Sequence, residues 1–155
     1  MKKFLTLALI LILFLVSSFS LGTSPSYAYS QSDLDRLLET RVCPECDLFG
    51  ADLSDADLQG ADLSSAKLSS AKLFNADLSD AKLFSADLSN ADLSNADLSY
   101  AKLFDADLSY ADLSYADLQG ADLSRAEVVG SSFKNAKLDR KWQFLQLYDR
   151  YTIDK

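Results

Sequence analysis

Two cysteines are the residues of this 155-residue chain whose type and spacing most directly suggest chemistry, in the motif Cys43-Pro44-Glu45-Cys46. In an exported protein, a pair this close favours a structural disulfide, and free thiols or a redox-active pair are the alternatives. Zinc needs four ligands, and the chain has no His and no further Cys to complete the set. A thioredoxin-like site would need the motif to open a helix after a strand. We therefore expect a disulfide between Cys43 and Cys46.

Carboxylates are abundant but are not arranged as a catalytic set. The chain has 23 Asp and Glu against 15 Lys and Arg, which gives a net charge of −8 and disfavours binding to nucleic acid phosphates. The absence of His excludes His-based triads, His metal sites and a His pH switch. No phosphate-cradling Gly loop is present, and the Asp pairs arise from a regular repeat. We predict no enzymatic activity, no catalytic residue and no cofactor.

The N-terminus has the three parts of a secretory signal peptide. Lys2 and Lys3 precede an apolar run at residues 4–16, and Ser26-Tyr27-Ala28 is a small-x-small cleavage site. The run of 13 residues is short for a membrane span, which needs ~20 residues, so an uncleaved anchor is the weaker alternative. We predict that residues 1–28 are removed and that the mature protein has no stable membrane insertion.

An unbroken five-residue repeat occupies residues 46–140, with Ala at the first position of nearly every unit and Leu at the third. The exceptions are Cys46 and Ser131 at the first position and Val128 and Phe133 at the third. A helix would spread these Leu over every side, because five residues advance ~500°. A flat strand would send alternate Leu to opposite faces. Only a chain that turns once per unit keeps Ala and Leu inside.

These units resemble the pentapeptide-repeat family, whose pattern is Ala-(Asp or Asn)-Leu-x-x. The resemblance covers about 95 of the 127 residues that follow Ala28. It implies an all-β solenoid: a right-handed, four-sided (quadrilateral) β-helix with four units per coil and with Leu and Ala stacked inside.

Both ends of such a rod expose backbone groups and core Leu, so we expect short α-helical caps. Residues 29–45 would form the N-terminal capping helix and junction, with Ser32 and Asp35 approximating a capping box. Residues 141–155 would form the C-terminal capping helix, in which Trp142, Leu145 and Tyr148 are spaced three apart. A partner-binding helix is the alternative for either segment.

Residues twenty apart should stack on the outside of a four-unit coil. The second positions then form an acidic column of Asp57, Asp77, Asp97 and Asp117, whereas Lys interrupts the neighbouring columns. A divalent cation needs six or more converging oxygens, so a solvated face is expected and weak cation binding is the alternative. No metal-ligating residue is assigned.

Aromatic residues are expected on the outer surface. Phe84 and Phe104 are twenty residues apart, and Tyr100, Tyr110 and Tyr115 fall in three different columns near one level of the rod. Outward aromatic rings favour contact with a partner, and rings folded against the wall are the alternative. We therefore name these five residues as the candidate partner surface.

These features favour a non-enzymatic, exported protein-interaction or scaffold element. The signal peptide, the Cys-Pro-Glu-Cys junction and the long array look like the exported pentapeptide-repeat proteins of cyanobacteria and chloroplasts, which implies the thylakoid lumen or the periplasm and an unidentified protein partner. The alternative is an acidic mimic of duplex DNA that acts on an enzyme such as gyrase. The signal peptide argues against this alternative because gyrase is cytoplasmic.

Overall fold

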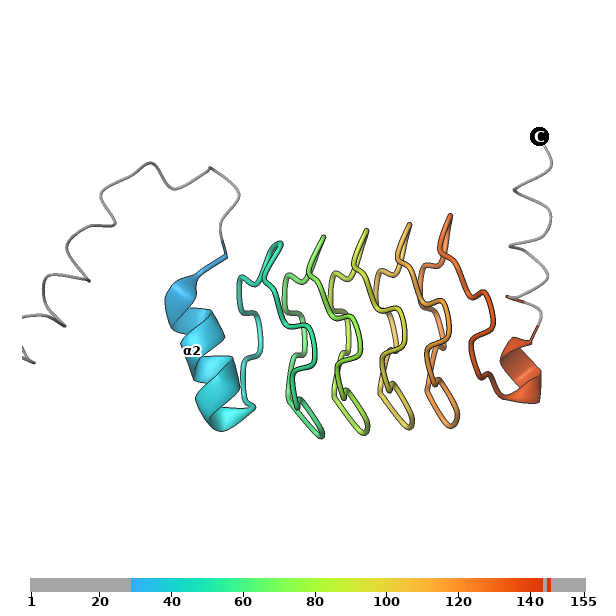
Figure 1. Ribbon diagram of the computed structural model, residues 1–155, viewed down its shortest axis with the longest axis horizontal. Helices are drawn as coiled ribbons and strands as arrows, with labels where there is room; N and C mark the ends of the chain where they lie inside the picture. Colours follow the sequence, from blue (N-terminus) through green and yellow to red (C-terminus); the bar gives the residue numbers. More distant parts are fainter. Residues whose placement is uncertain (1–28, 144, 146–155) are drawn as a thin grey trace, which may run out of the picture.

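The computed structural model of the protein describes residues 29–143 and 145. Helix α2 (Gln31–Thr40) lies at one end of a stack of coils, and the short 3-10 helix η1 (Arg140–Trp142) follows the last coil (Figure 1). The predicted signal peptide lies outside the described residues, as does most of the predicted helix at 141–155. Among the described residues, no helix has both the length and the hydropathy needed to cross a membrane.

The N-cap of helix α2 lies two residues before the predicted one. Its N-cap is Ser30, whose hydroxyl accepts a hydrogen bond from the Asp33 amide at 3.3 Å. The prediction of a capping box at Ser32 and Asp35 was wrong, because the chain is still extended at Ser30 and already helical at Ser32. The hydroxyl of Ser30 is therefore the one that reaches a free amide of the first turn.

The inner face of α2 packs on the first coil. Leu34 and Leu37 are buried in the same apolar cluster as the coil residues, whereas Leu38 points outward and is 56% exposed. The helix ends at Arg41, which adopts a left-handed conformation and donates its amide to the Leu37 carbonyl at 2.8 Å. This turn redirects the chain into the Cys43–Cys46 junction.

The coil contains four five-residue units. Parallel bridges join each second-position residue to the one twenty residues later, from Val42 with Asp62 to Asp117 with Lys137. Backbone hydrogen bonds also join successive coils. For example, the Leu63 amide donates to the Lys82 carbonyl, and the Lys82 amide donates to the Ala61 carbonyl, both at 2.8 Å. Among residues 29–143 and 145 these contacts remain isolated bridges and do not extend into long strands. Each extended segment is too short, because a turn follows every third residue.

The turn that closes each unit needs a left-handed residue at the fifth position. Asn90, for example, has φ 58°, and the next amide, that of Ala91, donates to the Leu88 carbonyl at 3.1 Å. A positive φ at the third of four turn residues is the requirement of a type II turn. The same conformation recurs at every fifth position from Glu45 to Asn135.

The core is the stacked first and third positions, as the repeat predicts. The Leu residues at third positions are buried, Leu98 completely, and Phe133 fills the same role near the C-terminal end. The first-position Ala residues are buried as well, except Ala56 and Ala126, which are partly buried. Small Ala and larger Leu layers thereby fill the interior without polar side chains.

Replacing Leu98 with Lys should unfold the rod, whereas Ser99→Lys should lower its melting temperature by at most a few degrees. Leu98 is fully buried, so Lys at that position would place an unpaired charge among stacked Leu and cost several kcal/mol. Ser99 is half-buried at the outward fourth position and can direct a longer side chain to solvent. Thermal melts followed by circular dichroism measure both variants, and equal shifts would contradict the assigned register.

Candidate interaction surface

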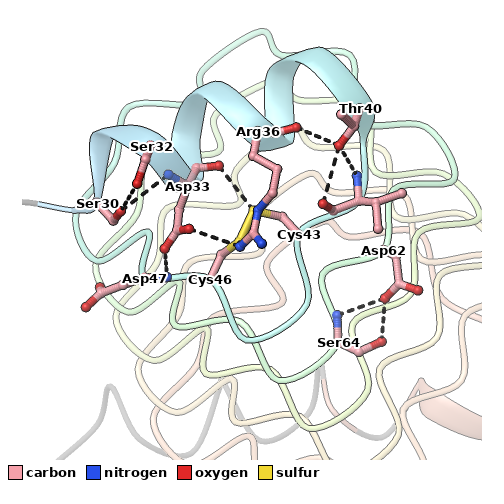
Figure 2. Close-up of a disulfide and its surroundings, with 11 residues drawn as sticks. Ser30, Ser32, Asp33, Arg36, Thr40, Cys43, Cys46, Asp47, Asp62 and Ser64 are labelled. Atoms are coloured by element: carbon pink, nitrogen blue, oxygen red, sulfur yellow. Dashed lines mark hydrogen bonds and ion pairs between the residues drawn. A yellow bond between two sulfur atoms is a disulfide. The ribbon is translucent and has the colours of Figure 1, made fainter.

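The two cysteines meet at the junction between α2 and the first coil. Cys43 and Cys46 are joined in a disulfide beneath the helix, with their Cα atoms 5.4 Å apart (Figure 2). Both side chains face inward and are essentially buried, at 0% and 1% exposure. The repeat register predicted inward positions for both cysteines, and the disulfide predicted between them is present.

Two residues of α2 surround this disulfide. A guanidinium nitrogen of Arg36 lies 2.6 Å from Cys46 Sγ and 3.0 Å from an Asp33 carboxylate oxygen. Asp33, Cys43 and Cys46 place their ligand atoms within 4.8 Å of one another, a grouping that could hold a metal ion. Three ligand atoms are one short of a closed tetrahedral zinc site, and sulfurs joined to each other are not thiolates. The disulfide with Asp33 and Arg36 therefore suits a structural role, in which it holds α2 against the first coil.

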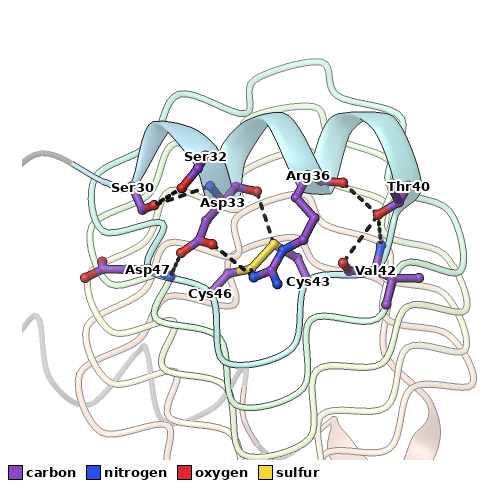
Figure 3. Close-up of polar contacts among 9 residues, drawn as sticks. All are labelled: Ser30, Ser32, Asp33, Arg36, Thr40, Val42, Cys43, Cys46 and Asp47. Carbon is purple, nitrogen blue, oxygen red and sulfur yellow. Dashed lines mark hydrogen bonds and ion pairs between the residues drawn. A yellow bond between two sulfur atoms is a disulfide. The ribbon is translucent and has the colours of Figure 1, made fainter.

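Asp33 also supplies a hydrogen-bond acceptor that the first coil lacks. In later coils the second-position amide donates to a carbonyl of the preceding coil, but Asp47 has no preceding coil. Its amide donates instead to Asp33 Oδ2 at 3.0 Å, and its carbonyl accepts from the Ser30 amide at 2.8 Å (Figure 3). Asp33 was not singled out from the sequence, because nothing local indicates that its carboxylate replaces a backbone carbonyl.

The outward Asp at the second position stabilises the turn of its own unit by accepting hydrogen bonds. Each second-position Asp accepts a hydrogen bond from the backbone amide two residues later, at the fourth position. Where the fourth residue is Ser, its hydroxyl often donates too, as from Ser64 to Asp62 at 2.7 Å (Figure 2). The hydrogen bond from the Ser64 hydroxyl is the main cause that lowers the pKa of Asp62. The Ser64 amide lowers this pKa as well, and partial desolvation opposes both by raising it.

Three of the four Phe residues at fourth positions follow a Lys at the second position of the same unit. Lys72, Lys82 and Lys102 are each followed two residues later by Phe, and only Lys67 among the inner Lys is followed by Ser. Lys has no acceptor for the Ser hydroxyl, so the hydrogen bond that favours Ser after Asp is lost. This correlation between the second and fourth positions of a unit is visible in the sequence.

The predicted acidic column exists and ends in cations. Consecutive bridges join Asp57, Asp77, Asp97 and Asp117. Arg41 pairs with Asp57 at one end, and Lys137 pairs with Asp117 at 2.8 Å at the other. The hydrogen bond and charge of Asp117 raise the pKa of Lys137. These carboxylates already accept amide hydrogen bonds, and weak cation binding there stays a prediction.

The predicted aromatic surface is not one patch. The structure brings Phe84 and Phe104 together in adjacent coils, because the bridge between Lys82 and Lys102 aligns them. The three Tyr residues, Tyr100, Tyr110 and Tyr115, occupy different corners of the coil, as their spacing of five and ten residues requires.

Two of these tyrosines cover glycines of the next coil. A Cβ atom added to Gly120 would lie 2.5 Å from Tyr100 Cδ1, and one added to Gly130 would lie 2.6 Å from Tyr110 Cδ1. Each ring therefore occupies the space that a side chain twenty residues later would need. The rings remain more than half exposed, at 59% for Tyr100 and 64% for Tyr110.

The sequence profile described as "Pentapeptide repeats (8 copies)" matches residues 46–83, 61–99 and 101–140, which together are more than half of the chain. The chain belongs to the pentapeptide-repeat family. Members of this family form right-handed β-helix solenoids, and this protein has their repeat and their coil.

Solved pentapeptide-repeat structures resemble this protein over different lengths. HetL, a protein of the cyanobacterium Nostoc involved in heterocyst differentiation regulation, is 40% identical, with a TM-score of 0.60 over 63% of this chain and 46% of HetL. A protein from the Arabidopsis thaliana thylakoid lumen is 28% identical, with a TM-score of 0.35 over 80% of this chain and 81% of its own. The alignment thus spans less than half of HetL. A comparison with curated proteins finds no match.

Gly120→Ala should destabilise this pentapeptide-repeat rod more than Gly60→Ala. Both glycines have positive φ, which costs Ala about 1–2 kcal/mol, but a Cβ at Gly60 meets nothing within 4 Å. At Gly120 the Tyr100 ring must also move, which adds about 1–3 kcal/mol. Denaturant melts of the two variants measure the difference, and Tyr100→Ser should abolish it. A difference that survives Tyr100→Ser would contradict the contact.

Ser64→Ala should raise the pKa of Asp62 toward its ordinary value of 3.8. A folded pKa below the unfolded one adds stability that is present above about pH 3.9 and is lost as the pH falls through the folded pKa. The stability difference between wild type and variant should therefore be full at neutral pH and shrink in acid. NMR titration of the Asp62 carboxyl, with melts at several pH values, measures both effects.

The matched control is Ser69→Ala, because Ser69 follows Lys67 and has no carboxylate in its own unit. It should leave the pKa of Asp62 unchanged. An unshifted Asp62 in Ser64→Ala, or a stability difference equally large at pH 2 and pH 7, would refute the role of the Ser64 hydroxyl.

Proposed function

We propose that the protein is a non-enzymatic, exported interaction or scaffold element of the thylakoid lumen or the periplasm. In this proposal the coil is a four-sided rod whose N-terminal end is capped by α2. One observation carries the proposal: the described residues bury no carboxylate, amine or guanidinium, and Ser79 is their one buried polar residue. The charged groups of the described residues are all at least partly exposed. Exposed charges suit recognition of a partner better than catalysis, which uses buried, perturbed groups.

Two features of the chain support export. The leader has a charged start, an apolar run and the Ser26-Tyr27-Ala28 site. The junction has a buried cysteine pair placed for a disulfide, and such bonds persist in oxidising compartments. In that setting the disulfide would hold the junction of α2 with the first coil, where the stack of backbone bonds begins.

Imitation of duplex DNA is the second candidate function. The observation in its favour is the column of Asp57, Asp77, Asp97 and Asp117 along the rod. Two observations oppose it: Lys side chains interrupt the other three columns, and residues 1–28 have the pattern of a signal peptide, which would direct the chain away from cytoplasmic gyrase. A gyrase supercoiling assay with the purified protein decides the matter, because inhibition that Asp77→Asn and Asp97→Asn together relieve would support mimicry.

Cleavage after Ala28 should leave Tyr29 as the first residue of the exported protein. Expression of the full chain in a cyanobacterium, followed by fractionation, alkylation without reduction and mass spectrometry, reads the compartment, the N-terminus and the thiols together. The expected product starts at Tyr29, lies in the lumen or periplasm and contains no alkylated cysteine.

Ala28→Phe should block this processing, because the cleavage site requires a small residue at that position, whereas Tyr29→Phe should be processed normally. Recovery of an intact leader on cytoplasmic wild-type protein would contradict export. Two alkylated cysteines in an exported protein would leave export standing and reject the disulfide.

A further inference from the structure

We propose that one face of the rod binds an acidic segment of a partner protein that also carries an apolar side chain. This face, here named the Lys–Phe face, consists of Lys82, Phe84, Lys102 and Phe104. The inference rests on the proposed interaction function and adds to it the face that is used and the chemistry of the partner.

The charge pattern of the four outward columns singles out this face. The columns that contain Asp47, Asp52 and Asp57 each have a net negative charge over their length. The fourth column runs Asp62, Lys82, Lys102, Asp122, so its centre is two adjacent cations on an acidic molecule. An acidic partner is repelled by three faces and attracted by the middle of the fourth.

Lys102 is the cation that a partner carboxylate would pair with. Lys82 forms an ion pair with Asp62 at 3.2 Å. Lys102 follows Lys82 in the column, is exposed and makes no ion pair with any residue in the described part of the chain. Like charges directly opposed on neighbouring extended segments are unfavourable, so a carboxylate bound between these lysines would relieve their repulsion.

Aromatic rings lie beside these cations. Phe84 is 38% exposed, and Phe104 is half-buried beneath Arg125, whose guanidinium carbon is 5.2 Å from the ring centroid. Arg125 is itself held by Asp105 at 2.8 Å. The face therefore offers the exposed Phe84 ring to an apolar side chain. It offers Lys82 and Lys102, with the adjoining Arg125, to carboxylates over three consecutive coils.

A narrow protein segment fits this pattern better than a membrane or a second copy. An anionic lipid surface would also meet the acidic columns that flank the face. An antiparallel pairing of two copies through this face would oppose Lys82 and Lys102 of one copy to the same lysines of the other. A single extended segment can be confined to the centre of the face, where Lys82, Lys102 and Phe84 lie between Asp62 and Asp122.

The test is a fluorescence-anisotropy titration of the purified protein with a labelled peptide in which Glu alternates with Leu. The peptide should bind at low ionic strength, and 0.5 M salt should weaken binding because exposed ion pairs are screened. Lys102→Asp should weaken binding about tenfold, and Phe84→Ser should weaken it at both salt concentrations. Both changes restore residue types that the repeat uses at those positions, so folding should be preserved.

The matched controls lie on another column. Lys72→Asp changes the net charge as Lys102→Asp does, and Phe74, at 44% exposure, is as exposed as Phe84. Lys72→Asp and Phe74→Ser should leave binding unchanged. Equal losses in the control variants, or no binding by the wild type, would overturn the Lys–Phe face without touching the export test of the proposed function.

Two further measurements distinguish the other occupants. Flotation with phosphatidylglycerol vesicles should leave the protein unbound, and sedimentation velocity should find a monomer whose mass is unchanged by Lys102→Asp. Vesicle binding lost in Lys102→Asp would assign the face to lipid. Self-association lost in Lys102→Asp would assign it to a second copy. Either result would overturn the proposal.

Discussion

The backbone hydrogen bonds between residues about twenty apart are the interaction on which the rest of the structure depends. They form only if every unit turns through the same angle, and this turn requires a left-handed residue at each fifth position. Gly, Asn and Asp at most of these positions reduce the cost of positive φ. The Ala and Leu core is then a consequence of the coil, because the first and third positions of each unit face inward.

The same coil divides the outer positions between structure and recognition. Where the second residue is Asp, its carboxylate accepts the fourth-position amide, so most acids of this protein serve the turn as well as its surface charge. Where it is Lys, that bond is lost and Phe replaces Ser in three of the four inner units. Departures from the repeat therefore mark the places where a rod of this kind can acquire a distinctive face.

Periodic, local information predicted much of the fold, and single contacts between distant elements escaped it. The inward Ala and Leu followed from spacing alone, because every unit repeats the same constraint, whereas the four units per coil were what the family resemblance implied. The N-cap at Ser30 and the acceptor role of Asp33 did not follow from spacing, since both depend on how α2 lies on the first coil. The contact of the Tyr100 ring with Gly120 also escaped prediction, because the repeat shows that residues twenty apart stack but not which way an exposed ring turns.

Residue-by-residue amide hydrogen exchange, measured by NMR, tests the hydrogen-bonded coil most directly. Amides at the second, third and fifth positions of inner units donate between coils and should exchange slowly. The fourth-position amides should exchange faster, and fastest at Ser69, Phe74, Phe84 and Phe104, where Lys replaces the accepting Asp. A five-residue period in protection, with its minimum at the fourth position, is the expected result. Uniform protection, or a period near 3.6 residues, would contradict the hydrogen-bonded coil.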